Sequence, residues 1–482
     1  MSQRPSWWSV HRPAAPTASP EPVPERAEVV VVGGGLTGLT TALQLSKAGV
    51  RVVVLEAHTL GAGTTSRSTA KVSLLQGSRF SEISRWQSVE RLRQYAEANR
   101  EGQAWLRRFC LEHDVPWDDR DGFTYANTDA GLRMLEKELS ASNAAGIPVA
   151  WAQTPELPYD VRGAIRLPDQ GQVDPVAMIA ALADQARAHG VVVVEGTRVR
   201  SVGHRRPVLV ETERGDIRAD TVVLATGMPI LDRSAAFARM KAERSYTVAL
   251  KAPDLAVRGQ YLSVDPPSRS LRSTVGAEGT PVLLVGGAGH GTGRSVPTSR
   301  HVEQLTSWAA EHFPGASPVT SWSAQDYAPT RGLPHVGPAL PRLPGVLVAG
   351  GFAKWGFTNG VAAALALTAR ITGGQVPWAE AFDPWQVADL RTTPRAAQHN
   401  AEVGLAMGRG VVHVVRNRRR GPICTHMGGA LTWNDTERSW DCPLHGSRFA
   451  ADGEVLDAPA TCGLRRVPTP PTGSTDPTEG AQ

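Results

Sequence analysis

The sequence predicts an α/β, Rossmann-like nucleotide-binding domain that carries an α+β lobe, followed by a small all-β domain. Three observations lead to this prediction. A βαβ pattern with a glycine-rich turn spans residues 28–56, mixed strands and loops span about 245–330, and paired Cys and His residues lie between 424 and 445. The length of 482 residues agrees, since it corresponds to two or three domains.

Composition narrows the class of protein. Apolar residues make up 41% of the chain and charged residues 20%, which is enough for buried cores and unlike a disordered chain. No run of about 18 apolar residues occurs, so we expect no membrane span, and the first residues lack the apolar core of a secretory signal. Four cysteines exclude a disulfide scaffold and favour the reducing cytoplasm.

The formal net charge of +5 does not predict a nucleic-acid partner. Of the 51 basic residues only six are lysine, and this arginine bias is typical of genome composition rather than of a phosphate-binding face. The one dense basic run, 416–420, has no interleaved aromatic residues. It is interpreted as a solvated turn or, alternatively, as a docking patch for an acidic redox partner.

The predicted elements follow one another along the chain. Residues 1–27, rich in proline, are expected to form a flexible arm. A buried strand at 28–32, a helix closed by Gly49 and a second strand at 50–55 form the βαβ unit. Further segments are predicted as a helical region at 80–145, a helix at 175–188, strands at 191–195 and within 198–224, a strand at 346–351 and a helix at 357–371.

Composition shifts set the expected domain boundaries. The large unit is predicted over 28–375, a linker over 376–402, the small domain over 403–466 and a disordered tail over 467–482. A second glycine cluster at 285–293 lacks the GxGxxG spacing and is followed by polar residues, so it is predicted to be a loop. No second dinucleotide site is therefore expected.

The glycine pattern Gly33-x-Gly35-x-x-Gly38 is weak evidence by itself. It indicates a dinucleotide-binding turn here because a predicted strand precedes it and a helix and a second strand follow it. Glycines at these places allow a tight turn and a close approach to a pyrophosphate, whose charge would rest on the helix N-terminus. Glu56, at the end of the second strand, is placed to accept hydrogen bonds from ribose hydroxyls. The alternative is a glycine-rich turn that holds no ligand.

The second motif is the more specific. Cys424-x-His426 and Cys442-x-x-His445 are separated by the residues 427–441. Two thiolates and two imidazoles suit a Rieske [2Fe–2S] cluster, with sulfur on one iron and nitrogen on the other. Zinc is the alternative, although zinc sites prefer both cysteines in one knuckle. Ser447 is placed to donate a hydrogen bond to a cluster sulfur.

Together the motifs resemble a known combination. The large unit resembles the D-amino-acid-oxidase-like (DAO) family of FAD-dependent oxidoreductases, which has a glutathione-reductase-type FAD-binding domain. Beyond the glycine turn, the matching segments are 61–71, 225–227, 332–337 and 351–360. The C-terminal unit resembles a Rieske domain, and this domain order resembles a bacterial group of DAO–Rieske fusions over about residues 5–466.

This resemblance implies two cofactors, FAD and a [2Fe–2S] Rieske cluster. Arg67 stands where some relatives carry a flavin-linking histidine, so the FAD is expected to be non-covalent. The cluster ligands would be Cys424, His426, Cys442 and His445. The residues implied along the FAD are Gly33, Gly35, Leu36, Thr37, Gly38, Glu56, Thr64, Thr65, Lys71, Val72, Val199, Gly227, Gly351, Lys354, Gly356 and Thr358.

The chain also departs from the family pattern. Gly429 and Leu444 occupy places that often hold an extra cysteine pair, and Phe449 replaces a tyrosine that commonly donates to a ligand cysteine. Both changes are expected to lower the cluster potential or loosen the site. Candidate residues for the substrate face are Arg331, His335, Lys354, Trp355 and Tyr246.

The resemblance implies an enzyme that oxidises a small amine or amino acid at a C–H bond next to nitrogen. The flavin would accept the hydride and a Rieske cluster would accept electrons one at a time. An external electron acceptor or donor is expected, without an identity. Two alternatives stay open: an oxygen-using oxidase with a structural or sensing cluster, and an electron-transfer module for a partner oxygenase.

Overall fold

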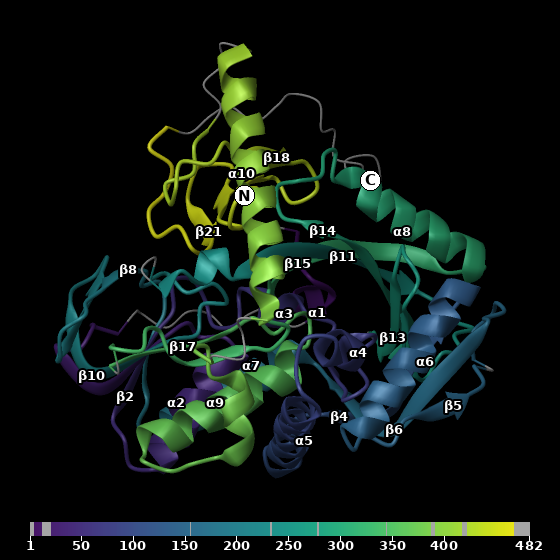
Figure 1. Cartoon of the computed structure of the whole chain (residues 1–482), viewed down its shortest axis with the longest axis horizontal. Coiled ribbons are helices and arrows are strands. Elements are labelled where there is room, and N and C mark those ends of the chain that lie inside the picture. Colours follow the sequence, from purple (N-terminus) through teal and green to yellow (C-terminus); the bar gives the residue numbers. More distant parts are fainter. Residues whose placement is uncertain are drawn as a thin grey trace.

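The protein is built around three β-sheets (Figure 1). The structure, a computed structural model, describes residues 4–11, 21–154, 156–231, 234–276, 279–343, 345–386, 391–416 and 422–466, without the side chains of 409–416. The first two sheets form the large unit, and the third forms a small unit at the C-terminal end of the described chain. The predicted fold class is confirmed: an α/β domain with an α+β lobe and a small all-β domain. No helix of the described residues is long and apolar enough to cross a membrane.

The first sheet is the nucleotide-binding sheet. Its order is β16-β17-β10-β1-β2-β7, and strands β17, β10, β1, β2 and β7 run parallel. Successive valines of the first strand point to opposite faces, Val29 and Val31 into one core and Val30 and Val32 into another, so both faces are buried. The strands are β1 (Arg26–Val32), β2 (Val52–Leu55), β7 (Val192–Val194), β8 (Val199–Val202), β9 (Val208–Thr212), β10 (Ile217–Leu224), β16 (His335–Pro338) and β17 (Val346–Gly350).

Helices cover one face of this sheet. Figure 1 shows α2, α7 and α9 below it, with α5 alongside. Gly102 of α5 lies so close to α9 that an added Cβ would overlap the carbonyl oxygen of Thr358, so glycine sets the spacing of the two helices. The helices are α2 (Leu36–Lys47), α3 (Thr64–Arg67), α4 (Arg79–Ser84), α5 (Val89–Glu112), α6 (Asp129–Ala144), α7 (Pro175–Ala188) and α9 (Gly356–Ile371).

The second sheet forms the lobe. Its order is β15-β11-β14-β13-β12-β4-β6-β3, with β5 paired to β6 and helix α8 (Ser299–His312) packed on β11 and β14. The glycine cluster at 285–293 was predicted to be a loop, but most of it lies in β14. An added Cβ at Gly287 would lie 2.5 Å from the carbonyl oxygen of Ser268, so the glycines allow close strand packing. The strands are β3 (Lys71–Val72), β4 (Trp117–Ala126), β5 (Ala150–Ala152), β6 (Gly163–Val173), β11 (Met240–Lys251), β12 (Gln260–Ser263), β13 (Arg269–Val275), β14 (Pro281–Gly291) and β15 (Ser317–Pro329).

The third sheet is a four-stranded antiparallel meander, in the order β18-β19-β20-β21. It packs around a small core of its own that includes Cys424, Cys442 and Phe449. Its strands are β18 (Thr432–Asn434), β19 (Ser439–Asp441), β20 (Arg448–Ala450) and β21 (Val455–Asp457).

Part of the expected linker is helical in the structure. The linker predicted over 376–402 contains the 3₁₀ helix η4 (Pro377–Phe382) and the first part of the long helix α10 (Thr393–Arg416), which crosses the expected domain start at 403. Helix α10 passes beside the small unit (Figure 1) and contacts the 3₁₀ helix η2 (Ala236–Ala238), where Asn400 donates to the carbonyl of Ala238. The run 417–420 and the tail 467–482 lie outside the described residues.

Within the arm expected over 1–27, residues 4–11 pack against the large unit. Helix α1 (Trp7–His11) buries Trp7 and Trp8, and β1 begins at Arg26. Trp8 donates from Nε1 to the carbonyl of Ser68 over 2.9 Å and lies against the Arg272 guanidinium. Trp8 thus anchors this segment to the residue that follows α3, while Trp7 packs in a core cluster with Val282 and Leu284 of the lobe. The proline-rich composition gave no sign of this anchor.

The Trp8 anchor gives a testable prediction. Trp8→Phe should lower the free energy of unfolding by about 1 kcal/mol, because the partly buried carbonyl of Ser68 loses its donor. Urea unfolding of both proteins measures the difference. Trp385→Phe is a matched control: Trp385 also donates to a carbonyl but is 38% exposed, so water replaces the lost donor and the change should stay below about 0.5 kcal/mol. Equal losses in the two variants would contradict the anchoring role.

Candidate functional site

The glycine-rich turn between β1 and α2 has the geometry that its sequence predicted. Gly33 has φ of 110°, and an added Cβ there would lie 2.6 Å from the carbonyl oxygen of Ala225. A Cβ on Gly38 would overlap the carbonyl oxygen of Gly33, so Gly38 lets α2 pack directly against the turn. Glu56 accepts from the backbone N–H of Gly34 over 2.7 Å and of His58 over 2.9 Å, which fixes its carboxylate at the end of β2.

A long cavity of about 420 Å³ begins at this turn and extends to the lobe. It joins the carboxyl ends of β1 and β2, the segment 61–71, the inner face of the second sheet and the turn before α9. Twelve of the sixteen predicted FAD residues line it: Gly33, Gly35, Leu36, Thr37, Glu56, Thr64, Thr65, Lys71, Val199, Gly227, Lys354 and Gly356.

Four predicted FAD residues do not line the cavity. Gly38 and Gly351 shape the turns beside it, and Val72 is buried in the core. Thr358 is also buried, and its hydroxyl donates to Asn99 over 2.6 Å and accepts from Gln76. These hydrogen bonds connect α9 to α5. Thr358 therefore helps to position α9 and does not itself line the cavity.

The turn before α9 is held in an unusual backbone conformation. Ala353 and Lys354 have φ of 48° and 73°, a region that residues other than glycine seldom adopt. The backbone N–H of Lys354 donates to the buried carboxylate of Asp326, which stabilises the turn. Strain of this kind is concentrated at ligand-binding sites, and the turn presents Lys354 and Trp355 to the cavity.

Three of the five candidate residues for the substrate face line the cavity, and two do not. Tyr246, Lys354 and Trp355 line the cavity, whereas Arg331 and His335 do not. Arg331 is only 2% exposed and donates to the carbonyls of Ala381 and Asp383, so it holds η4 in place. His335 is also buried and lines a separate small hollow. Burial beside Arg239 and Arg331 lowers the pKa of His335 well below its usual value, so its neutral ring cannot attract a carboxylate.

Lys71 lines the cavity and has a strongly lowered pKa. Its Nζ donates to the Tyr261 carbonyl over 3.0 Å and to the Ser270 hydroxyl over 2.7 Å. Burial, with the Arg272 guanidinium as a smaller cause, lowers the pKa of Lys71 to about 7. The amine is therefore able to change its charge near neutral pH.

This pKa predicts a pH-dependent stability. In the unfolded chain Lys71 has its ordinary pKa of about 10.4, so above about pH 7 the unfolded state binds a proton that the folded state lacks. Wild-type stability should therefore rise between pH 7.5 and 8.5 by about 1 kcal/mol more than that of Lys71→Met. Urea unfolding of the FAD-free proteins at both pH values measures this, and exposed Lys137→Met should follow the wild type. Equal pH slopes for the wild type and Lys71→Met would show that Lys71 stays charged in the fold.

The paired Cys and His residues come together in the small unit. The thiols of Cys424 and Cys442 are in hydrogen-bond contact, and the rings of His426 and His445 lie 5.3 Å apart between centroids. Among the described residues, no three or more Cys, His, Asp or Glu side chains converge as they would on one metal ion. Two thiols and two imidazoles are the ligand types of a Rieske two-iron cluster.

Two further observations fit a cluster at this place. The Nδ1 atom of His445 is buried and has no hydrogen-bond partner among the described residues, as expected of an atom reserved for a metal. The Ser447 hydroxyl contacts Cys424 and accepts from the backbone N–H of Ala460 over 3.0 Å. The predicted hydrogen bond from Ser447 to a ligand sulfur is thus geometrically possible.

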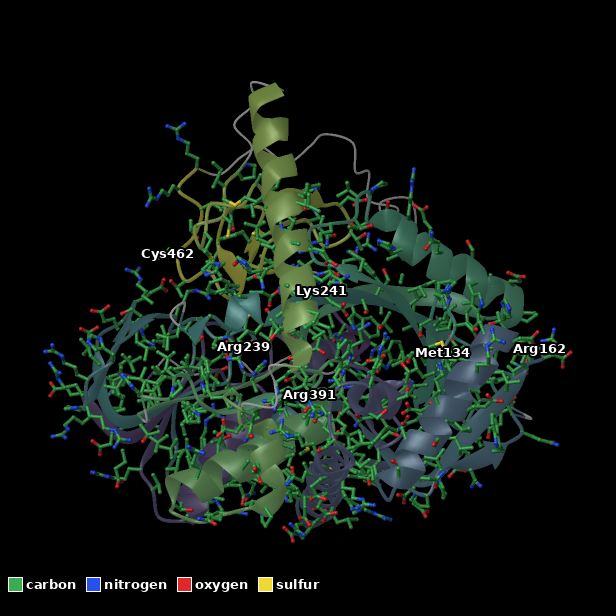
Figure 2. All side chains as sticks on the ribbon, viewed as in Figure 1. Met134, Arg162, Arg239, Lys241, Arg391 and Cys462 are labelled. Carbon is green, nitrogen blue, oxygen red and sulfur yellow. The ribbon has the colours of Figure 1, made fainter. Side chains whose placement is uncertain are left out.

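The histidine pair faces the large unit. The ring of Phe237, in η2, lies 4.8 Å from that of His445 and 5.8 Å from that of His426. Gly446 fits so closely that an added Cβ would overlap the Cβ of Ala242. Cys462, by contrast, is exposed and lies on the outer side of the small unit (Figure 2).

Comparisons with known proteins agree with this architecture. The family model for FAD-dependent oxidoreductases (DAO) matches residues 28–370, and the model for the Rieske [2Fe–2S] domain matches 402–470. The chain belongs to the FAD-dependent oxidoreductase family. It carries a Rieske domain at its C-terminal end, and the cofactors of these two domains are FAD and a [2Fe–2S] cluster. The resemblance inferred from the sequence is therefore confirmed.

This oxidoreductase is similar over most of its length to two relatives. The chain is 30% identical over 474 residues to YhfW of Bacillus subtilis (strain 168), named as a Rieske 2Fe-2S iron-sulfur protein; the match covers 91% of this chain and 93% of YhfW. Glycine oxidase of Geobacillus kaustophilus is 27% identical over 70% of this chain and 89% of its own. A crystal structure of glycine oxidase from that organism superposes with a TM-score of 0.63 at 20% identity, covering 75% of this chain and 99% of that chain.

Sequence reasoning missed several residues of the oxidoreductase cavity. Arg198 and Asp326 line it, and so do Leu456, Asp457, Ala458, Ala460 and Thr461 of the Rieske domain. Arg198 stands next to the predicted Val199 and could have been found from that neighbour. The Rieske residues could not, because only the docking of the two domains brings them to the cavity.

Proposed function

We propose that this oxidoreductase oxidises a small amine or amino acid at a C–H bond next to nitrogen and passes the electrons through its Rieske domain. The name of its relative glycine oxidase supports this substrate class. When bound, FAD supplies a hydride acceptor and the cluster a one-electron acceptor. The four cysteines form no disulfide, which supports a cytoplasmic location.

In this proposal the predicted residues that line the cavity hold non-covalent FAD. The backbone N–H groups at the start of α2 would stabilise the pyrophosphate, and Gly33 and Gly35 would leave room for its approach. The carboxylate of Glu56 keeps lone pairs free for ribose hydroxyls beyond its two backbone donors. Cys424, His426, Cys442 and His445 hold the cluster.

The lobe provides the substrate side. Tyr246 gives the cavity a buried aromatic wall, while Lys354, which also lines the cavity, provides a cation for a substrate carboxylate. The substrate loses a hydride from carbon while the nitrogen lone pair forms the C=N bond, and water then hydrolyses the imine to a carbonyl and an amine or ammonia. The amine must be neutral for this, and Lys71, with its lowered pKa, is suited to take the ammonium proton.

A direct connection between the cavity and the cluster loop carries the electron-transfer part of the proposal. Tyr327 lines the cavity, and its hydroxyl accepts from Nε2 of Gln325 over 2.9 Å. The same Nε2 donates to the carbonyl of Gly446 over 2.7 Å, and Gly446 follows the proposed ligand His445. A short bonded path of this kind supports electron exchange between the two domains rather than two independent cofactors.

An anaerobic titration tests the proposal. The purified holoprotein is mixed with simple amines, N-methyl amino acids and D- and L-amino acids, while flavin absorbance and electron paramagnetic resonance (EPR) are recorded together. We expect one class to bleach the flavin and to raise the signal of the reduced Rieske cluster in step with it. Dithionite serves as the control that the cluster is reducible.

Other outcomes favour the alternatives. A bleached flavin with an oxidised cluster, together with peroxide formed in air at the rate of substrate turnover, would favour an oxidase whose cluster is structural or sensing. A flavin reduced by dithionite but by no amine or amino acid would contradict the substrate class. It would favour an electron-transfer module for a partner oxygenase.

A further inference from the structure

A segment of the Rieske domain forms part of the wall of the cavity in the large unit. We call residues 455–461, which comprise β21 and the four residues after it, the strap. Five of its seven residues line the cavity, together with the glycine turn and Glu56. A ligand in this cavity therefore contacts both domains.

The strap is attached to the FAD-binding unit at three points. Arg198 donates from Nη2 to the carbonyl of Val455 over 2.8 Å, and Tyr327 donates from its hydroxyl to the carbonyl of Ala458 over 3.4 Å. Arg244, only 1% exposed, lies 3.6 Å from the carboxylate of Asp457. Two of these three partners, Arg198 and Tyr327, line the cavity themselves.

The same strap is attached to both loops that carry the proposed cluster ligands. The backbone N–H of Ala460 donates to the hydroxyl of Ser447, two residues after His445, over 3.0 Å. That hydroxyl also contacts Cys424 in the other loop. Arg448, next to Ser447, forms an ion pair with Asp457 over 2.8 Å. Movement of the cluster loops is therefore transmitted to residues that touch the cavity.

We propose that the strap is a shared part of both cofactor sites and couples them. With the cluster in place, the loops around Cys424 and His445 hold Ser447, and Ser447 holds the strap against the cavity, which raises the affinity for FAD. By thermodynamic linkage FAD stabilises the cluster-loaded form by the same factor. This inference rests on the proposed assignment of the cavity to FAD, but it is independent of the substrate.

The test is the dissociation constant of FAD, measured without substrate. FAD is removed from the full-length protein, the cluster is left in place or removed by reduction and chelation, and FAD is titrated back with its fluorescence as the readout. We expect FAD to bind at least tenfold more weakly to the cluster-free protein. In the reciprocal experiment, FAD should slow the bleaching of the cluster by a chelator.

One variant breaks the hydrogen bond between the strap and Ser447 while the cluster stays in place. Ser447→Ala keeps the four proposed ligands but removes the acceptor for Ala460, so we expect the EPR signal to persist while FAD binds three- to tenfold more weakly. Asp452→Ala is the matched control, because Asp452 is exposed on the turn before β21 and, among the described residues, its side chain bonds only within that turn. Unchanged FAD affinity in either the cluster-free protein or Ser447→Ala would overturn the coupling. Failure of every form to bind FAD would instead overturn the assignment of the cavity.

Discussion

Replacement of Cys442 by serine is expected to remove the [2Fe–2S] cluster completely. A serine oxygen is a poor substitute for a thiolate on iron, and Cys442 is 2% exposed, so no other ligand can reach its place from solvent. The purified variant should contain no bound iron, lack the visible absorbance of the cluster and give no Rieske EPR signal after dithionite. Metal analysis, absorbance and EPR measure the three effects.

The other two cysteines serve as controls for this prediction. Cys462→Ser changes an exposed thiol on the outer side of the Rieske domain, so the cluster should form as in the wild type. Cys110→Ser changes a thiol in the core of the large unit, where burial raises its pKa to about 12 and keeps it unreactive. Iron retained in Cys442→Ser, or zinc in place of iron in the wild type, would contradict the ligand assignment.

The parts of the site that local sequence determines were predicted well. The turn at Gly33 and Gly38 and the βαβ unit around it depend on residues close together in the chain. The cluster loops likewise bring Cys424 and His426 together by their short spacing, and the same holds for Cys442 and His445. A pattern of spacing is enough to predict features of this kind.

The missed features depend on contacts between distant segments. Arg331 resembled a substrate anchor because its segment matches the family, but the carbonyls of η4, some 50 residues later, draw its guanidinium away from the cavity. The strap lines the cavity only because the Rieske domain docks on β11 and β15. Neither arrangement leaves a periodic or spacing signal, so only the three-dimensional structure reveals it.

The docking of the two domains depends on buried charges, and Arg67 has a central place among them. The sequence suggested only that Arg67 replaces a flavin-linking histidine. In the structure it lines the cavity and forms an ion pair with Glu437 of the Rieske domain over 2.6 Å. Glu437 is fully buried and also accepts from the backbone N–H of Ser323 over 2.9 Å. Three arginines and three carboxylates share this interface: Arg67, Arg244, Arg448, Glu437, Asp441 and Asp457.

Glu437→Gln is therefore expected to destabilise the docked Rieske domain by about 3–5 kcal/mol, because it leaves an arginine buried without its counter-charge. Urea unfolding should show the loss, and limited proteolysis should cut the Rieske domain earlier than in the wild type. The exposed pair Glu28–Arg51 provides the control, since Glu28→Gln breaks an ion pair that water already screens and should cost far less stability than Glu437→Gln.

A double variant then distinguishes an unpaired charge from lost packing. Arg67→Met combined with Glu437→Gln removes both charges of the pair, so most of the stability lost in Glu437→Gln should return, and the two single changes should be strongly non-additive. If the double variant were instead as unstable as the sum of the single ones, shape rather than charge would hold the domains together. If the double variant regains stability, the ion pair contributes little net free energy to docking. The pair then destabilises any docked arrangement in which Arg67 does not meet Glu437. In that case the pair acts by fixing how the Rieske domain sits against the cavity.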